Sequence, residues 1–253
     1  MNVLRSGVIS PTYANMVLDG LEPMILNVYW RSKAKKTFSV KYNNRKVHVV
    51  RFADDFIVTA SDKDTLKEIK RMIERFLAER GLTLSEEKTV ITHIDDGFDF
   101  LGWNFRKFSG KLIIKPSHKS MCKITKKISM TIKDNQTAKQ EDLIRKLNEI
   151  TIGWANYHHS TCAKKSYSTI DHRTWEMLWK WAKRRHPNKS KSWIANKYWK
   201  IHRGRKWTFM SDKNILFLMM DMPIVRKGQM ALDKNPFLDK EYFEIRLPQS
   251  HWL

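Results

Sequence analysis

The sequence places two adjacent carboxylates, Asp54 and Asp55, between two short runs rich in β-branched residues, 47–53 and 56–60. These runs predict an antiparallel hairpin with the two acids at its turn. Mg²⁺ prefers oxygen ligands and usually takes one or two carboxylates together with substrate phosphates. The pattern is therefore compatible with a Mg²⁺ site for phosphoryl transfer at Asp54 and Asp55. An ordinary Asp-Asp turn is the alternative, and the dipeptide alone favours that alternative.

The spacing of hydrophobic residues predicts the helices and strands that would position Asp54 and Asp55. After the hairpin, residues 66–77 carry apolar side chains at helical intervals, and we expect Ser61 to cap this helix and Gly81 to end it. Residues 82–84 and 89–92 have the composition of short extended pieces. Residues 98–105 predict a second strand pair bent at Gly102.

From about residue 117 the pattern becomes helical. We expect helices over 118–133, 138–150, 168–185 and 190–200, with a break at Pro187. Beyond residue 201 the spacing of prolines predicts short strands and loops. The predicted fold class is α+β: an antiparallel hairpin sheet with a helix, followed by a helical portion.

Charge is concentrated in that helical portion. The chain has 253 residues and a net charge of +22. Residues 111–200 hold 21 Lys and Arg against 6 Asp and Glu, whereas residues 1–110 hold 18 against 14. A surface so positive indicates a polyanionic partner, and nucleic acid is the favoured one. The alternative is a lysine-rich face that is solvated and binds nothing. The cations that we expect to bind phosphate are Lys88, Lys123, Lys126, Lys127, Lys183, Arg184, Arg185, Lys189 and Lys191.

Aromatic residues are interleaved with these cations. Exposed rings could stack on unpaired bases. Trp175 and Trp179, however, are four residues apart on one predicted helix, so core packing is the favoured interpretation for any single Trp.

Cysteine and histidine give little support to a metal or disulfide framework. Cys122 and Cys162 are the two cysteines, and neither stands in a CxxC pair. His158 and His159 lie near Cys162, but adjacent histidines point in different directions on a helix, so zinc is not expected. The N-terminus predicts neither a signal peptide nor a membrane span, and we expect a cytoplasmic protein without a membrane partner.

Several strings together resemble a known family. Phe-Ala-Asp-Asp at 52–55 resembles the aromatic-x-Asp-Asp signature of reverse transcriptases. The strings Gly-Val-Ile-Ser-Pro at 7–11, Gly-Leu-Thr-Leu-Ser-Glu-Glu-Lys-Thr at 81–89 and Phe-Asp-Phe-Leu-Gly-Trp at 98–103 resemble other blocks of these enzymes, in the family's order. Gly-Trp-Ala-Asn-Tyr at 153–157, Trp-Ala-Lys-Arg-Arg-His-Pro at 181–187, Asn-Pro-Phe-Leu-Asp at 235–239 and Tyr-Phe-Glu at 242–244 resemble the maturase and C-terminal parts of group II intron proteins.

The resemblance implies a domain plan and a set of roles. Residues 1–110 would form an incomplete polymerase palm, residues 111–200 a helical thumb and maturase-specific domain, and residues 201–253 a nucleic-acid-contacting tail. Asp54 and Asp55 would be the catalytic, metal-binding pair. The nucleotide and template pocket would take Ser10, Pro11, Asn15 and Phe52, and the primer grip would take Phe100, Leu101 and Gly102.

The sequence departs from the family pattern near its start. A further catalytic aspartate is expected on a strand well before Gly7, and the chain begins only six residues before that glycine. Leu4-Arg5-Ser6 stand where the family has Pro-Gln-Gly. No HNH nuclease motif follows the C-terminal segment. We therefore expect this chain alone to be inactive in DNA polymerisation.

Three functional hypotheses follow from the sequence. The chain could be the catalytic half of an RNA-directed DNA polymerase, a magnesium-dependent nucleotidyltransferase completed by a separate N-terminal fragment. It could be an RNA-binding maturase module that aids splicing without catalysis. It could also be the truncated remnant of a mobile element. The expected partners are structured intron RNA and an RNA/DNA duplex.

Overall fold

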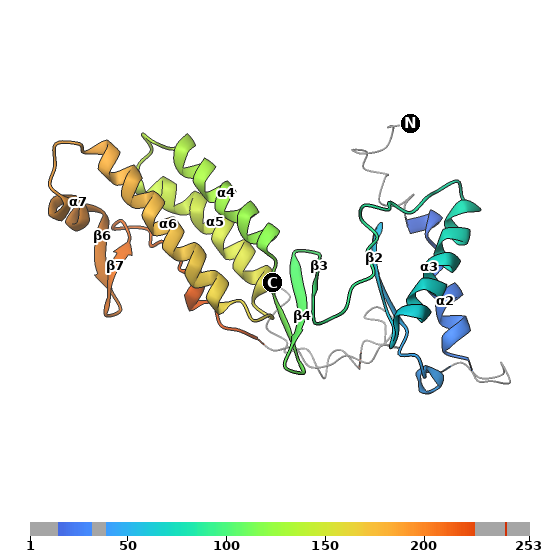
Figure 1. The fold of residues 1–253 in the computed structure, drawn as a ribbon. Coiled ribbons are helices and arrows are strands. Elements are labelled where there is room, and N and C mark those ends of the chain that lie inside the picture. The colour runs from blue at the N-terminus through green and yellow to red at the C-terminus, as the bar shows by residue number, and fades with distance from the viewer. Residues whose placement is uncertain (1–14, 32–38, 226–240, 242–253) are drawn as a thin grey trace. The chain divides into compact units, whose positions relative to one another are not determined.

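The structure, a computed structural model, describes residues 15–31, 39–225 and 241. It divides into two compact units, residues 1–92 and residues 93–253, and each unit is considered by itself (Figure 1). The predicted mixture of helices with small antiparallel sheets is confirmed. Among the described residues, no helix is both long and apolar enough to cross a membrane.

The first unit is a hairpin packed against helices. Strands β1 (His48–Phe52) and β2 (Asp55–Thr59) pair antiparallel, as predicted, beside α2 (Leu21–Tyr29), the short 3₁₀ helix η1 (Val40–Tyr42) and α3 (Lys63–Ala78). One face of the hairpin and the apolar stripes of the two α-helices close a small core. Its buried members are Leu18, Leu21, Ile25, Val47, Ile69, Ile73, Phe76 and Leu77.

The predicted details around α3 need two corrections. Asp62, not Ser61, caps the helix: its carboxylate accepts the backbone N–H of Thr65 at 2.8 Å. An ionised carboxylate is the stronger acceptor and its charge suits the helix N-terminus. Residues 82–84 and 89–92 belong to no strand. Among the described residues, neither segment pairs with the β1–β2 hairpin.

The second unit begins with a three-stranded antiparallel sheet. β3 (Phe98–Phe100) and β4 (Trp103–Phe108) form the strand pair predicted to bend at Gly102, and β5 (Lys111–Pro116) adds a third strand that the sequence did not indicate. Phe98 and Phe105 are paired across the first ladder, and their rings stack at 5.3 Å.

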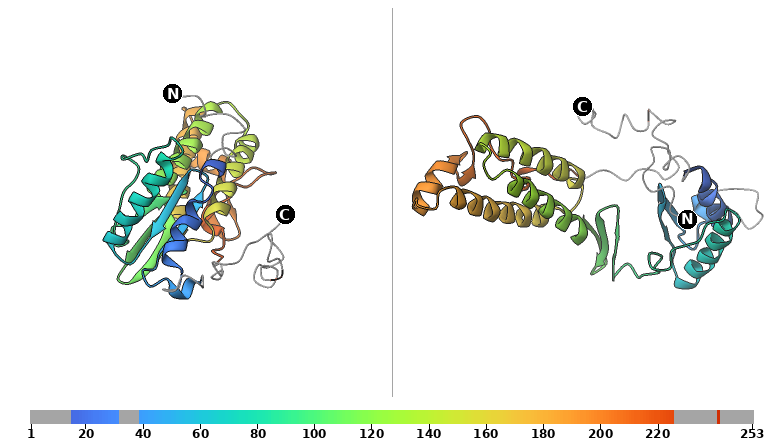
Figure 2. Two further views of the ribbon diagram at one scale, coloured as in Figure 1. Left: turned by 90° about the vertical axis from the view of Figure 1, so that its right-hand side faces the viewer. Right: turned by 90° about the horizontal axis from the view of Figure 1, so that it is seen from above.

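Three helices form most of the remainder: α4 (His118–Asp134), α5 (Gln140–His158) and α6 (Lys164–Arg185). They pack side by side (Figure 2) around buried Ile128, Leu147, Ile170 and Leu178. α5 is longer than predicted. Its last two turns carry Ala155 and His158 into the core, which adds contacts that local spacing does not reveal.

The bundle is completed by α7 (Lys191–Tyr198), the hairpin β6 (Trp199–His202) with β7 (Arg205–Phe209), and the 3₁₀ turn η2 (Met219–Asp221). Trp175 and Trp179 stack on each other at 5.8 Å, and both lie near Trp199 at the start of the hairpin. The interpretation of these two tryptophans as packing residues is therefore confirmed.

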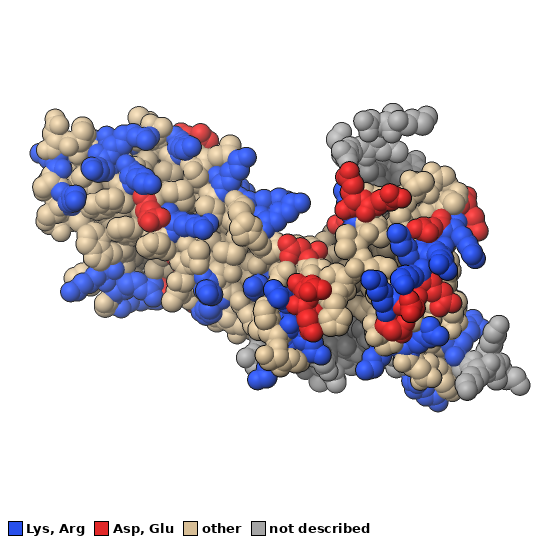
Figure 3. Space-filling view, in the orientation of Figure 1, with Lys and Arg blue, Asp and Glu red and all other residues tan. Residues whose placement is uncertain are grey.

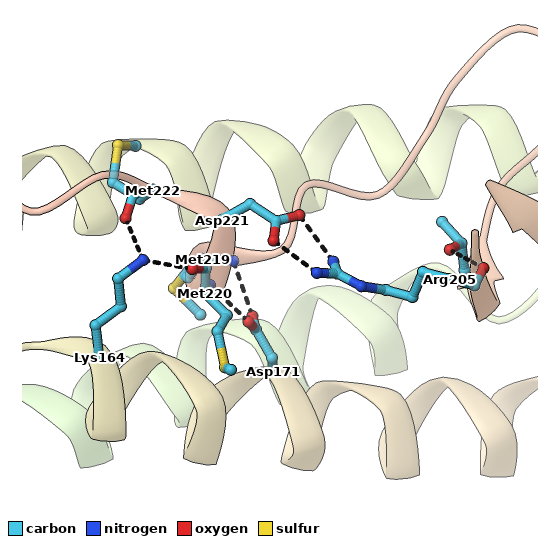
Figure 4. A network of polar contacts seen from close by, with 8 residues as sticks. Lys164, Asp171, Arg205, Met219, Met220, Asp221 and Met222 are labelled. Carbon is cyan, nitrogen blue, oxygen red and sulfur yellow. Dashed lines mark hydrogen bonds and ion pairs between the residues drawn. The ribbon is translucent and has the colours of Figure 1, made fainter. Parts of the chain in front are cut away.

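Polar contacts anchor η2 to α6 (Figure 4). The carboxylate of Asp171 accepts the backbone N–H groups of Met219 and Met220, and Arg205 forms a two-point ion pair with Asp221 at 2.8 Å. Burial raises the pKa of Asp171 to about 6. These contacts hold the segment after β7 across the bundle.

Candidate nucleic-acid interface and carboxylate pair

The carboxylate pair stands at the tip of the β1–β2 hairpin. Phe52 pairs with Asp55, so the loop contains only Ala53 and Asp54, and Asp55 is the first residue of β2. Ala53 has φ of +54°, which matches the first central position of a type II′ turn, a place that glycine normally occupies. The side chains of Asp54 and Asp55 are exposed. The turn thus presents both acids to solvent on a strained, fixed backbone.

Arg51 supports this turn. Its guanidinium donates one hydrogen bond to the backbone carbonyl of Ala53 at 3.2 Å and another to Oδ1 of Asn15 at 2.9 Å. Asn15, predicted in the nucleotide pocket, is therefore linked through Arg51 to Ala53, the residue that precedes Asp54. Sequence reasoning missed Arg51 because a cation in a strand carries no distinctive spacing.

The donor chemistry of the pair fits Mg²⁺ in part. Two exposed carboxylates on a fixed turn are a ligand type that this ion accepts, with water and phosphate oxygens filling the other positions. Across the parts of the chain that the structure describes, no group of three or more His, Cys, Asp or Glu could hold a metal. Asp54 and Asp55 would hold the ion, which when bound would stabilise charge on reacting phosphates.

The other predicted pocket residues have different settings. Phe52 lies next to the turn and is 62% exposed, like Val50 two residues earlier at 53%. One face of β1 near the carboxylates is therefore apolar and open. Lys88 is exposed in a turn after α3. Ser10 and Pro11 lie outside the described residues.

In the second unit, the predicted primer-grip turn is held by the predicted maturase motif. Leu101 and Gly102 form the two-residue loop between β3 and β4, with φ of +47° and +81°. The hydroxyl of Tyr157 donates to the carbonyl of Leu101 at 2.7 Å, and the Tyr157 ring stacks on Trp103 at 4.8 Å. The N–H of Ser117 donates to the carbonyl of Gly102. Two motifs that are more than 50 residues apart in sequence thus contact each other directly in the fold.

A buried histidine lies beneath this contact. His158 is fully buried, with the rings of Trp154 and Tyr157 at 4.4 Å and 4.9 Å, and its Nε2 lies 3.3 Å from Oγ of Ser120. The indole N–H of Trp154 donates to the same hydroxyl. Burial lowers the pKa of His158 to about 4. His158 is therefore a neutral residue of the core.

The predicted cations of α4 lie on different sides of that helix. Lys126 faces α6, in a shallow groove that it lines with Arg173, whereas Lys127 lines a groove toward α5. Lys123 is exposed between them. Lys and Arg gather over α4 and α6 in the space-filling view, with few acids among them (Figure 3).

The predicted cations at the end of α6 also differ in setting. Lys183 and Arg184 are exposed. Arg185 is half-buried: it donates to the carbonyls of Gln136 and Ala138 at 2.8 Å. Its guanidinium therefore holds the α4–α5 loop.

The cations around α7 surround one tryptophan. Lys189 and Lys197 lie over the ring of Trp193 at 5.3 Å and 4.9 Å, and Lys191 is exposed at the start of the helix. Trp193 is 38% exposed. Trp193 is therefore an exposed ring beside cations, whereas Trp175 and Trp179 are partly buried and pack against the core.

Comparisons with known proteins agree with the two halves of this arrangement. The family model for reverse transcriptase (RNA-dependent DNA polymerase) matches residues 2–105, and the model for the group II intron maturase-specific domain matches residues 121–199. The chain thus combines a region that matches the reverse transcriptase family with a region that matches the maturase-specific domain. The reverse transcriptase family generally uses a divalent metal.

Two relatives narrow the assignment. Group II intron-encoded protein LtrA of Lactococcus lactis subsp. cremoris is 32% identical over 94 residues, which cover 35% of this chain and 16% of the relative. A protein described as "Putative COX1/OXI3 intron 1 protein" of Saccharomyces cerevisiae is 41% identical over 64 residues, covering 24% of this chain and 8% of the relative. The chain matches less than a fifth of the length of either. The two family matches and these relatives together show a similarity to group II intron-encoded reverse transcriptase/maturases.

Proposed function

We propose that this chain binds structured intron RNA through its second unit and acts as the maturase part of a group II intron protein in splicing. The observation that carries the proposal is the charge of a well-folded bundle: 21 cations against 6 acids in residues 111–200. These cations surround a continuous buried core, so the charge belongs to a rigid surface. Such a surface is self-repulsive until phosphates neutralise it.

The first unit would contribute to a polymerase palm, and α4 to α6 would contribute to a thumb. The support is local: a strained turn presents two carboxylates, and the Leu101–Gly102 turn is fixed by Tyr157. A primer end needs a rigid support to be held in line for attack. The duplex bound in this way would be an RNA/DNA hybrid, and Mg²⁺ is the ion that two carboxylates with phosphates suit best.

RNA binding tests the main proposal. The full chain is titrated with a structured intron RNA at several salt concentrations, and fluorescence anisotropy gives the affinity. If about eight cations touch phosphates, the log–log salt slope should lie near −6 to −7. Lys183→Glu/Arg184→Glu should weaken binding and flatten the slope. Arg185 is left unchanged because its loss would disturb the α4–α5 loop.

Asp54→Ala is the matched control, because it lies in the other unit and removes an acid. It should leave RNA affinity unchanged. Binding that is independent of salt, or equal for the double variant and the parent, would contradict the proposal.

The polymerase role has a separate test. Primer extension with Mg²⁺ is measured on this chain with and without a polypeptide that supplies the fingers and the other palm strand of a family member. Extension is expected only with that polypeptide and should be lost with Asp54→Asn. Extension that persists in the variant would exclude the carboxylate pair from the centre.

A further inference from the structure

The helix pair α4 and α6 carries a groove whose chemistry differs from that of the groove between α4 and α5. Its lining combines cations with sulfur-containing and small polar side chains: Cys122, Thr125, Lys126, Ser129, Met130, Lys133, Arg173 and Met177. Eight of the described residues line this groove, and none of these eight is Asp or Glu.

The groove between α4 and α5 provides the contrast. Lys127 and Lys146 line it, but so do Asp134 and Glu149. The two acids balance the two cations, so this side offers a phosphate little net attraction. The same helix therefore has one side that favours a polyanion and one that does not.

The basic side extends along α6. Lys180 and Arg184 follow Arg173 by 7 and 11 residues, intervals that return a side chain to the same helix face. Both are exposed. Because a helix rises about 1.5 Å per residue, these three cations span roughly 16 Å along α6, beginning at Arg173 in the groove. That is a track for several successive phosphates.

We propose that this α4–α6 groove holds a single strand of RNA, with phosphates on the cationic rims and sugars or bases against the two methionines. The inference rests on the proposed RNA-binding function and adds the surface and the form of the RNA. The groove holds about 420 Å³, which is the size of a site for a small ligand, and we infer that it takes a short stretch of one strand. Met130 is 52% exposed there, and a flexible, polarisable thioether suits a base face of any sequence.

Cys122 allows a test on the unaltered chain. Both cysteines are free and exposed, but only Cys122 lines the groove. The chain is alkylated with N-ethylmaleimide, with and without a saturating unstructured uridine 12-mer, and mass spectrometry follows each thiol. We expect the oligonucleotide to slow alkylation of Cys122 about tenfold or more while Cys162 reacts as before. A hairpin RNA of equal length should protect Cys122 less.

Charge variants give an independent readout. Lys126→Gln/Lys133→Gln removes two groove cations, and Lys139→Gln/Lys146→Gln removes two cations that lie outside this groove. For single-stranded RNA each lost phosphate contact should reduce the salt slope by about 0.7, so the first variant should lose about 1.4 and the second close to nothing.

The outcomes separate this inference from the proposed function. If RNA binds with the expected salt dependence but leaves Cys122 fully reactive, or if both double variants lose equally, the groove assignment is overturned and the RNA-binding proposal stands. If only the hairpin RNA protected Cys122, the groove would bind a duplex and not a single strand, and the groove assignment would also be overturned. If no RNA binds the full chain, the groove assignment and the RNA-binding proposal are both wrong.

Discussion

At the scale of single residues, the second unit contains a histidine that must stay neutral. His158 is fully buried among aromatic rings, and its folded pKa is about 4, below the ordinary value of 6.5. Between these two pH values the unfolded chain binds a proton that the folded chain does not. The stability from the neutral ring is therefore complete above about pH 6.5 and is lost as pH falls toward 4, by roughly 3 kcal/mol.

His158→Gln should remove this pH dependence. Urea unfolding at pH 4.5, 5.5, 6.5 and 7.5, followed by tryptophan fluorescence, gives the free energy of unfolding of parent and variant. Asp171 changes the free energy of unfolding in the opposite direction. Its folded pKa is raised from 3.8 to about 6, so its contribution to stability is lost as pH rises through this range. Asp171 is present in both proteins, so the difference in unfolding free energy between parent and variant gives the contribution of His158 alone. His172→Gln, at an exposed position, is the control, and an unchanged pH slope in His158→Gln would contradict the prediction.

At the scale of elements, the β3–β4 turn depends on the last turns of α5. Tyr157→Phe keeps the ring that stacks on Trp103 but removes the hydroxyl that binds Leu101. We expect a loss of about 1 kcal/mol in the free energy of unfolding, typical of one hydrogen bond. Hydrogen exchange at the amides of residues 101–103 should become faster, because the positive φ of Leu101 loses its restraint.

Tyr167→Phe is the matched variant. Its hydroxyl also donates to a backbone carbonyl at 2.7 Å, that of Ala155. It should cost comparable stability while leaving exchange at 101–103 as it is in the parent. Equal exchange rates at the turn in both variants would show that Tyr157 does not hold it.

At the scale of the whole molecule, two separate cores predict separable stability. Residues 1–92 and 93–253 are distinct compact units, and each has its own buried cluster. We expect residues 93–253, expressed alone, to unfold cooperatively and to bind RNA within about threefold of the full chain, because phosphate contacts dominate affinity. Circular dichroism melts and anisotropy measure the two properties. A non-cooperative melt would contradict this prediction.

The isolated first unit should behave differently. Its hairpin has only two strands, and Val50 and Phe52 are exposed on it. Open strand edges and apolar side chains favour association, so we expect poor solubility for this fragment. The predicted boundary at residue 110 stays a prediction, since compactness divides the chain at 92 while the reverse transcriptase match continues to residue 105.

Local patterns in the sequence determined the hairpin with its Asp54–Asp55 tip, the helices of the second unit and the concentration of positive charge. They did so because strand alternation, helical spacing and turn preferences act over a few residues. The same reasoning named Ser61 as a cap where Asp62 performs that role, since both side chains satisfy the capping pattern and only the backbone geometry selects one.

Only the tertiary structure decided which side chains meet. It brought Tyr157 to Leu101, assigned Arg185 to the α4–α5 loop, and placed Lys126 and its neighbour Lys127 in two different grooves beside one helix. The reason is geometric: contacts between residues far apart in sequence depend on how helices and sheets pack, and neighbours on a helix point 100° apart. A run of charges therefore predicts affinity for a polyanion, whereas the folded surface decides where that polyanion can lie.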